Sequence, residues 1–430
     1  MSRRTQTISF LLLIVSSGAY AAQGEWTRFR GPDGSGISDA KTVPVQWTEK
    51  DYNWKVKLPG VGHSSPVVWG NRIFLTSGEP ETGKRTILGL DAADGRIVWQ
   101  RDYPSKTFKQ HRDNSFASAT PAVDSQGVVL TWTTPEEVVL LALDLEGREV
   151  WRRSLGPFLT LHGSGSSPII VEDLVVLAND QEDPKALPEI YGARAATLPS
   201  GKSFLIALDR KTGETRWRLD RRTSQAPYST PCVLRPKGGR PEVILTSTAN
   251  GITAVDAATG KIAWELDNVF RERCVGSPVS APGLVIAGDG YGVRGTRIVA
   301  VRPGSRERGE KPTVAYEIKP PVPLVPTPLV KDGRLFLWGD DGVVACLDAA
   351  SGKLFWRERA GGSFYGSPVC VNNRLYCTAR NGDVVVLAAS DKFEPLARVP
   401  LGEPSFATPA VSGGVMYLRT RSQLFSLGGK

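Results

Sequence analysis

The sequence predicts an all-β protein, an eight-bladed β-propeller made of four-stranded antiparallel blades. Eight Ser-Pro or Thr-Pro pairs that are each followed directly by a short apolar run recur along the 430 residues. The prolines of successive pairs lie 40 to 63 residues apart, a period typical of propellers and solenoids. The pairs are Ser65-Pro66, Thr120-Pro121, Ser167-Pro168, Thr230-Pro231, Ser277-Pro278, Thr327-Pro328, Ser367-Pro368 and Thr408-Pro409.

The sixth repeat unit shows how each unit divides into four strands. An apolar strand over 329–331 follows the proline, and an Asp-Gly turn leads into a second strand over 334–338. The third strand covers 344–347, and the fourth, over 354–356, carries a tryptophan. Runs of β-branched and aromatic residues separated by turn residues are typical of hairpins, so the repeat predicts an antiparallel blade.

An Asp-containing turn and a tryptophan mark the outer half of most units. The Asp side chain accepts backbone N–H groups within the turn, and the Gly adopts the positive φ that closes it. The tryptophan buries a large surface against the neighbouring unit, so we interpret both residues as scaffold rather than as catalytic groups. The turns are Asp91/Gly95, Asp144/Gly147, Asp209/Gly213, Asp256/Gly260 and Asp348/Gly352, and the tryptophans are Trp99, Trp151, Trp217, Trp264 and Trp356.

The last unit lacks a fourth strand, and the N-terminal region supplies a candidate for it. Residues 424–427 form the third strand of unit eight, and the chain ends shortly afterwards. Residues 54–59 have the same spacing as the fourth strand that begins at Trp151. We therefore expect residues 52–57 to complete the last blade and close the ring, which removes exposed sheet edges.

The first 21 residues predict a secretory signal peptide. Arg3 and Arg4 precede a short apolar core over 8–15, and Ala19-Tyr20-Ala21 is a cleavage site. Both the general secretory route and the twin-arginine route stay open. We expect a signal peptide over 1–21, an N-terminal extension over 22–51 and the propeller over 52–430, in a periplasmic or secreted protein without an integral membrane segment.

Composition argues against a nucleic-acid-binding protein. The formal net charge of +9 falls to +7 after residue 21, with 51 basic against 44 acidic residues. No run of Lys and Arg interleaved with aromatic residues is present, so we expect no nucleic-acid partner. A mildly basic surface favours acidic ligands or is simply solvated.

The five cysteines are expected to be buried thiols. Their odd number leaves at least one unpaired within the chain. Cys370 and Cys377 flank an Asn-Asn turn, in which Cys370 would face Leu375 rather than Cys377. A relaxed disulfide between these two is therefore not expected.

The repeated phrase places the chain beside a known family. The pattern Ala-x-Asp-x-x-Thr-Gly-x-x-x-Trp over 254–264, with a near match over 207–217, resembles the tryptophan-docking motif of quinoprotein (PQQ-like) propellers. The opening over 26–36 resembles that of secreted bacterial PQQ-binding-like propellers. The resemblance implies relatives of two kinds: a non-enzymatic propeller lipoprotein of outer-membrane protein assembly, and quinone-dependent alcohol and sugar dehydrogenases.

One face of the predicted ring collects the irregular loops. In a four-stranded meander, the loops before each first strand and those between the second and third strands share a face. That face receives His63, His111 and His162, and an insertion over 179–203. Irregular loops on a rigid scaffold usually carry binding. The residues proposed there as cofactor- or ligand-binding are Arg271, Arg273, Arg294, His63, His162, Asp180, Asp289 and Tyr291, with Lys109 and Arg112 as further basic candidates.

These residues leave several chemistries open. Three histidines could form a zinc site, but no pair has the close spacing that metal sites favour, so no metal ligand is assigned. Arginine forks suit an acidic planar molecule, such as the quinone PQQ bound with calcium. The chain has no adjacent cysteine pair, which the resemblance implies for quinone-dependent dehydrogenases, so no cofactor is assigned with certainty.

The sequence therefore favours an exported, non-catalytic propeller that serves as a binding or protein-interaction scaffold. The expected partner is an envelope or extracellular protein, or an acidic small molecule, and the chain is expected to be a monomer. The alternative is a small PQQ-dependent oxidoreductase acting on alcohols or sugars. Short catalytic signatures such as G-x-S-x-G and H-E-x-x-H are absent from the sequence.

Overall fold

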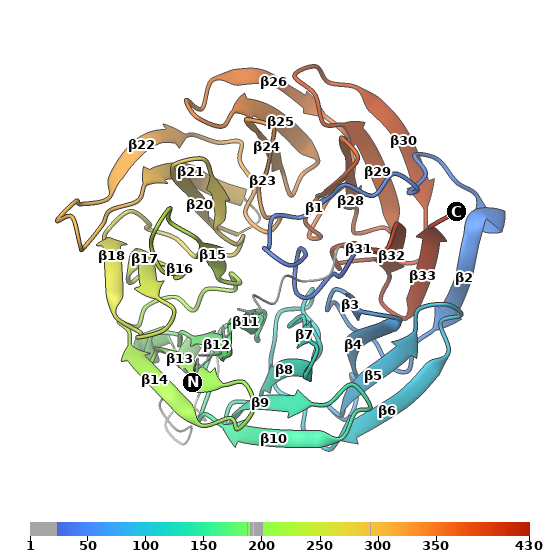
Figure 1. Cartoon of the computed structure of the whole chain (residues 1–430), viewed down its shortest axis with the longest axis horizontal. Coiled ribbons are helices and arrows are strands. Elements are labelled where there is room, and N and C mark those ends of the chain that lie inside the picture. The colour runs from blue at the N-terminus through green and yellow to red at the C-terminus, as the bar shows by residue number, and fades with distance from the viewer. Residues whose placement is uncertain (1–23, 187, 190–191, 193–200, 293) are drawn as a thin grey trace, which may run out of the picture.

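The computed structural model confirms the all-β prediction and the eight-bladed propeller. It describes residues 24–186, 188–189, 192, 201–292 and 294–430, so the predicted signal peptide over 1–21 lies outside the described residues. Eight separate sheets surround a central axis, with the chain passing from blade to blade in order (Figure 1). Within the described part of the chain, no helix is long and apolar enough to cross a bilayer.

Each blade runs from an inner strand of three residues to an outer strand. Blades 1 and 2 are β3 (Val67–Trp69), β4 (Arg72–Gly78), β5 (Arg85–Asp91), β6 (Ile97–Tyr103), and β7 (Ala122–Asp124), β8 (Gly127–Thr133), β9 (Val138–Leu143), β10 (Glu149–Ser154). Blades 3 and 4 are β11 (Ile169–Val171), β12 (Leu174–Asn179), β13 (Phe204–Asp209), β14 (Thr215–Asp220), and β15 (Cys232–Leu234), β16 (Glu242–Ser247), β17 (Gly251–Asp256), β18 (Ile262–Leu266). Blades 5 and 6 are β19 (Val279–Ala281), β20 (Leu284–Tyr291), β21 (Arg294–Arg302), β22 (Thr313–Ile318), and β23 (Leu329–Lys331), β24 (Arg334–Trp338), β25 (Val343–Asp348), β26 (Leu354–Arg359). Blades 7 and 8 are β27 (Val369–Val371), β28 (Arg374–Thr378), β29 (Asp383–Ala388), β30 (Pro395–Pro400), and β31 (Ala410–Ser412), β32 (Val415–Arg419), β33 (Gln423–Gly428) with β2 (Tyr52–Lys57).

The ring closes between the two ends of the chain, as the sequence predicts. Strand β2 pairs antiparallel with β33, from Tyr52 opposite Leu427 to Lys57 opposite Gln423. The Tyr52 ring also packs on Phe425, with 5.2 Å between the centroids. In Figure 1, β2 therefore lies beside β33, the last strand of the chain. Pairing with β2 covers the edge of β33, which would otherwise be exposed.

A docking circle of aromatic residues joins the outer strands to the turns of the next blade. Trp99 on β6 donates its Nε1–H to the carbonyl of Leu145, at 2.9 Å, in the turn before β10. A Cβ atom on Gly147 would lie 2.6 Å from the Trp99 ring, so only glycine lets the ring sit on this turn. The equivalent donors to the next blade are Trp54 to Ala92, Trp151 to Arg210, Trp217 to Ala257, Tyr316 to Ala349 and Trp356 to Ser390.

Blade 5 interrupts the docking circle because its sequence lacks the Asp turn. Its third and fourth strands are joined through Pro303 and Gly304 rather than through an Asp-x-x-Thr-Gly turn. The tryptophan of the preceding blade, Trp264, donates its Nε1–H to Glu242 of its own blade instead, at 3.0 Å. Blade 5 keeps the outgoing contact, since the Tyr316 hydroxyl replaces the indole N–H and donates to Ala349 at 2.7 Å.

The Ser/Thr-Pro pairs form a second circle around the axis, which we call the hydroxyl circle: Ser65, Thr120, Ser167, Thr230, Ser277, Thr327, Ser367 and Thr408. The backbone N–H of seven of these eight residues donates to the hydroxyl of the next blade, as from Ser277 to Thr327 at 3.1 Å. Thr408 donates to Ser65 at 3.1 Å and so joins the last blade to the first. The other bonds run from Ser65 to Thr120, Thr120 to Ser167, Thr230 to Ser277, Thr327 to Ser367 and Ser367 to Thr408.

The N-terminal extension blocks one end of the central channel. Trp26 bridges to Val68 of blade 1, and β1 (Ile37–Ser38) pairs in parallel with β27 of blade 7. Gly24 accepts a backbone bond from Gly413, in the first turn of blade 8. These contacts lie on inner strands and on the turns that follow them, which defines the turn face of the propeller. Figure 1 shows the segment before β2 crossing the middle of the ring.

The five cysteines are free and buried, as predicted. Cys370 lies opposite Leu375 in the β27–β28 pair, the register expected from the Asn-Asn turn. Burial raises the pKa of Cys232 and Cys346 to about 12, so these thiols stay protonated and pack as small apolar groups.

Candidate functional site

The channel encloses a cavity of about 170 Å³ lined by two residues from every blade. One is the member of the hydroxyl circle. The other stands two positions earlier in the chain, nearer the loop face, which lies opposite the turn face. We call this second set the upper circle: His63, Ser118, Gly165, Tyr228, Val275, Val325, Tyr365 and Phe406. All sixteen residues line the cavity, together with Phe29, Asp113 and Asn114.

Both ends of the cavity are covered by side chains from loops. Phe29, in the N-terminal extension, lines it from the turn face. On the loop face, Asp113 forms an ion pair with Arg380 of blade 7 at 2.7 Å, although Asp113 belongs to the loop that enters blade 2. The Arg380 guanidinium also lies 4.5 Å from the centre of the Tyr365 ring. The loop between β6 and β7 thus reaches across the channel mouth to blade 7.

The histidine on the upper circle is held in its neutral form. The His63 ring stacks on Phe406 with 4.4 Å between centroids. Burial, together with the nearby charges of Arg419 and Arg421, lowers the pKa of His63 to about 3. At neutral pH His63 therefore adds a polar aromatic surface to the cavity and no charge.

The other two predicted histidines meet each other at the loop face. The centroids of the His111 and His162 rings lie 5.2 Å apart, edge to face. The backbone N–H of His111 also donates to the backbone carbonyl of His162 at 3.1 Å. Burial, then Arg273 and His111, lower the pKa of His162 to about 4. His63 stands apart from this pair, against Phe406. Among the described residues, no three His, Cys, Asp or Glu side chains gather in a group that could hold a metal ion.

Arg273 is engaged in a two-pronged ion pair. Its Nη1 and Nη2 donate to the carboxylate of Glu182 at 3.0 and 3.2 Å. The guanidinium also lies 5.5 Å from the centre of the Tyr228 ring on the upper circle. Its fork is therefore occupied by Glu182, and its influence on the cavity passes through Tyr228.

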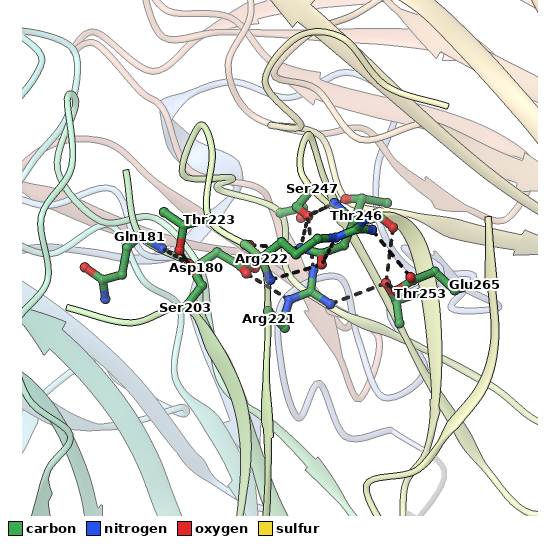
Figure 2. Close-up of polar contacts among 12 residues, drawn as sticks. Asp180, Gln181, Ser203, Arg221, Arg222, Thr223, Thr246, Ser247, Thr253 and Glu265 are labelled. Atoms are coloured by element: carbon green, nitrogen blue, oxygen red, sulfur yellow. Dashed lines mark hydrogen bonds and ion pairs between the residues drawn. The ribbon is translucent and has the colours of Figure 1, made fainter. Parts of the chain in front are cut away.

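Asp180 belongs to a buried polar network between blades 3 and 4. Its carboxylate accepts a bond from Arg221 Nε at 2.8 Å, with 5% and 2% of the two side chains exposed. The Arg221 guanidinium continues to Ser247 and Thr253 of blade 4, as Figure 2 shows. A nearby bond links Ser203 and Thr223 at 2.7 Å. Through Arg221, Asp180 therefore links blade 3 to blade 4.

Asp289 is occupied by the loop that precedes blade 5's inner strand. One of its oxygens accepts the backbone N–H groups of Arg271 and Glu272 at 2.8 and 2.9 Å. The other accepts the Thr296 hydroxyl at 2.6 Å. This buried carboxylate fixes the backbone of the loop that contains Arg271 and Glu272.

Three other predicted residues stand on the surface of the loop face. Arg271 and Arg294 are exposed, and 76% of the Tyr291 side chain is exposed. Arg294 borders a second cavity of about 320 Å³, shared by blades 5 and 6 and lined mostly by proline, glycine and aliphatic residues. Asp340 also lines it, and burial raises the pKa of Asp340 to about 6. The predicted residues thus fall into separate groups, of which His63 alone lines the central cavity.

The upper circle is the part of the site that the sequence reasoning missed. Tyr228, Tyr365 and Phe406 each stand two residues before a Ser/Thr-Pro pair, the same offset as His63. This constant offset was available as a signal, because equivalent positions of a repeat face the same way in every blade. Arg380 carries no such signal, since its contact with Asp113 joins loops 267 residues apart.

The size of the central cavity and the state of its neighbouring carboxylates bear on whether a quinone and calcium could bind. Ligand pockets usually enclose about 300–1,000 Å³, and the central cavity is smaller, at about 170 Å³. The two carboxylates suggested for calcium are engaged by Arg221 and by backbone N–H groups. As arranged here, the residues do not fit the cofactor, and the cofactor-binding assignment stays a prediction.

The fold has three features of the quinoprotein-like class of propellers. Its blades are four-stranded, an N-terminal strand closes the ring, and aromatic residues dock on the Asp-containing turns between third and fourth strands. Within that class, the chain belongs to the family described as outer membrane protein assembly factor BamB. Family matches cover residues 45–187, 137–319 and 313–422. Together they cover residues 45–422, which include strands from all eight blades.

Two curated relatives match parts of the chain. BamB of Moranella endobia (strain PCIT) is 25% identical over 228 residues, which cover 49% of this chain and 56% of that protein. The serine/threonine-protein kinase AfsK of Streptomyces griseus is 37% identical over 111 residues, 25% of this chain and 13% of the kinase. The chain therefore matches about half of the first protein's length and a small part of the second.

Solved structures share the fold at low sequence identity. BamB from Moraxella catarrhalis aligns with a TM-score of 0.58 at 14% identity, over 86% of this chain and 97% of that one. Quinohemoprotein alcohol dehydrogenase from Comamonas testosteroni gives 0.63 at 13% identity, over 96% and 81%. The computationally designed Ika8 protein gives 0.60 at 12% identity, over 88% and 99%. At such identities the likeness concerns the fold alone.

Proposed function

We propose that the protein is an exported, non-catalytic scaffold that binds an envelope protein through the loop face of its propeller. The family membership supports this, because the family is described by a role in outer membrane protein assembly. We propose a periplasmic or secreted location, with a signal peptide over 1–21, an extension over 22–51 and the propeller over 52–430. The chain is proposed to act as a monomer.

One observation carries the proposal: some polar residues of the loop face hold loops and blades together, whereas others are exposed to solvent. Asp180, Arg273 and Asp289 hold loops and blades in place. Tyr291 and Arg294 instead project from the β20–β21 hairpin beside the 320 Å³ cavity. A large exposed aromatic side chain and an arginine on a rigid hairpin are the residue types that anchor protein interfaces.

The alternative is a small PQQ-dependent oxidoreductase. It is supported by the shared fold with quinohemoprotein alcohol dehydrogenase and opposed by the poor fit of the central cavity. Titration of the purified protein with PQQ and calcium, followed by absorbance, together with a dye-linked assay on alcohols and sugars, separates the two. Saturable binding with turnover would replace the scaffold proposal.

The scaffold proposal is tested by photo-crosslinking from opposite faces. A photoreactive amino acid replaces Tyr291 on the loop face, and a matched protein carries it at Lys353, exposed in the turn before β26. In intact envelopes, we expect a discrete crosslinked product from position 291 and none from 353. Equal products from both positions, or none from either, would contradict the proposed interface.

A further inference from the structure

The residues of the hydroxyl circle line the cavity, and their O–H groups have no hydrogen-bond acceptor in the described structure. Seven of its members accept a backbone N–H from the preceding blade, at 2.9–3.1 Å. None of these hydroxyls donates to an acceptor among the described residues. Because these residues line the cavity and their O–H groups have no acceptor in the described structure, the O–H groups are free to donate to a molecule in the channel. The circle therefore presents a ring of donors to the axis.

The circle is open at one point, and an arginine reaches it there. No bond from the Ser167 N–H to Thr230 completes the circle within the described structure, although seven of the eight links are made. Arg28 of the N-terminal extension donates its Nη1–H to the carbonyl of Pro231, the residue after Thr230, at 2.9 Å. Its Nη2 is buried and has no partner in the described structure.

A second arginine of the extension is equally uncompensated. Arg30 donates one bond to the Ser35 carbonyl at 2.9 Å, and its Nε and Nη1 are buried without partners in the described structure. The two side chains are 4% and 1% exposed, and no described carboxylate lies within ion-pair distance of either. Glycines make room for both, since a Cβ on Gly34 or Gly36 would lie within 3 Å of a guanidinium. Asp33 acts on both charges from a distance, but two buried positive charges without a direct ion pair still carry a large desolvation cost.

Phe29 lies between these arginines in the chain and lines the cavity. The cavity's one carboxylate, Asp113, is already neutralised by Arg380. The cavity is lined by the O–H groups of the hydroxyl circle, and the buried guanidiniums of Arg28 and Arg30 flank Phe29 in the chain without lining the cavity themselves. The surroundings of the cavity are therefore electropositive. Such surroundings disfavour a cation and favour a ligand that only accepts hydrogen bonds.

We propose that the central channel is a binding site for one small oxyanion of the phosphate or sulfate class, held by the hydroxyl circle and attracted by the nearby buried charges of Arg28 and Arg30. The cavity of about 170 Å³ is far larger than the roughly 10–15 Å³ that one water needs. Small carboxylates share the same acceptor chemistry. The competing occupant is a cluster of water, which would satisfy the O–H groups but leave the arginines uncompensated. This inference does not depend on the scaffold proposal.

The first test measures the anion directly. The purified protein is dialysed into chloride buffer, denatured in acid and analysed by ion chromatography. A second sample is titrated calorimetrically with inorganic phosphate, sulfate and acetate at constant ionic strength. We expect about one retained phosphate or sulfate per chain, or saturable binding of one. A protein that neither retains nor binds any of the three, and therefore holds water only, overturns the proposal.

The second test locates the site with matched substitutions. Thr327→Val and Ser277→Ala each remove one hydroxyl, whereas Thr327→Ser keeps it. A lost hydrogen bond to a charged group is expected to weaken binding about tenfold or more, so the first two variants should bind less tightly and the serine variant should match the parent. Arg294→Ala, on the exposed loop face, is the control for non-specific anion binding.

Circular dichroism first establishes that each variant is folded. Two blades are tested so that a folding failure at one leaves the other informative. Equal affinity in the parent, Thr327→Val and Ser277→Ala would move the anion elsewhere and overturn the site. A loss of affinity in Arg294→Ala as large as in the hydroxyl variants would do the same.

Discussion

Two circles of contacts join the same blades, one at the periphery and one at the axis. They differ in the hydrogen-bond donors that remain unused. In the docking circle the indole N–H groups of Trp54, Trp99, Trp151, Trp217 and Trp356 are used on carbonyls of the next blade, as from Trp151 to Arg210 at 3.0 Å. In the hydroxyl circle seven of the eight backbone N–H groups are used, but the hydroxyl protons remain. The first circle is a structural contact alone. The second is structural and also offers donors, so the same periodicity yields stability outside and a candidate site inside.

The largest expected effect comes from deleting the N-terminal segment, which supplies Trp54 to the docking circle and contacts the residue next to Thr230 of the hydroxyl circle. Deleting residues 24–57 takes away β2, which carries Trp54, and the extension that fills the channel. We expect the loss of cooperative unfolding, because blade 8 loses its outer strand and the ring opens. Thermal unfolding followed by circular dichroism measures this.

A shorter deletion separates the two contributions. Removing residues 24–47 keeps β2 but not Arg28 and Arg30, and we expect a folded protein with a lower melting temperature. An unchanged melting temperature after the longer deletion would contradict ring closure by β2.

A direct comparison of the two circles uses one substitution in each. Trp151→Ala removes a side chain that is only 8% exposed, and we expect it to lower the free energy of unfolding by about 3–5 kcal/mol. Thr327→Val leaves the Ser277 N–H without its acceptor and is expected to cost about 1 kcal/mol. Urea unfolding of both variants measures the difference.

The conservative partners of these variants sharpen the comparison. Trp151→Phe keeps most of the packing but loses the N–H bond, and Thr327→Ser keeps the hydroxyl. We expect the first to fall between the parent and Trp151→Ala, and the second to match the parent. Equal costs for Trp151→Ala and Thr327→Val would show that the axis stabilises the ring as strongly as the periphery does.

The docking circle was predictable from sequence, while the cavity was predictable only in part. Asp-x-x-Thr-Gly turns and tryptophans are local signals, because each forms within one hairpin. The repeat count and the closing strand followed from the same pattern and are confirmed. His63 was named from its position before a Ser/Thr-Pro pair, and it does line the cavity.

Contacts that join distant loops could not be predicted in this way. Arg380 meets Asp113 across 267 residues, and Arg28 meets Pro231 across 203. Neither pair has a local sequence signature, since its geometry depends on how blades on opposite sides of the ring are placed. The burial of Asp180 is of the same kind, because it depends on Arg221 reaching from β14 toward blade 4.

A smaller effect than that of Trp151→Ala is expected from protonation at the axis, where the upper circle contains a histidine and the docking circle contains none. The folded-state pKa of His63 is about 3, below its ordinary value of 6.5, so the unfolded chain binds a proton more readily between these values. The contribution of neutral His63 is therefore fully present above pH 6.5 and is lost as the pH falls toward 3. We expect His63→Gln to reduce the loss of stability on going from pH 7 to pH 5 by about 1–2 kcal/mol. Urea unfolding at the two pH values measures this, with His111→Gln as the control at a histidine that is 44% exposed. The same pH dependence in His63→Gln and the parent would show that the acid sensitivity of the axis arises elsewhere.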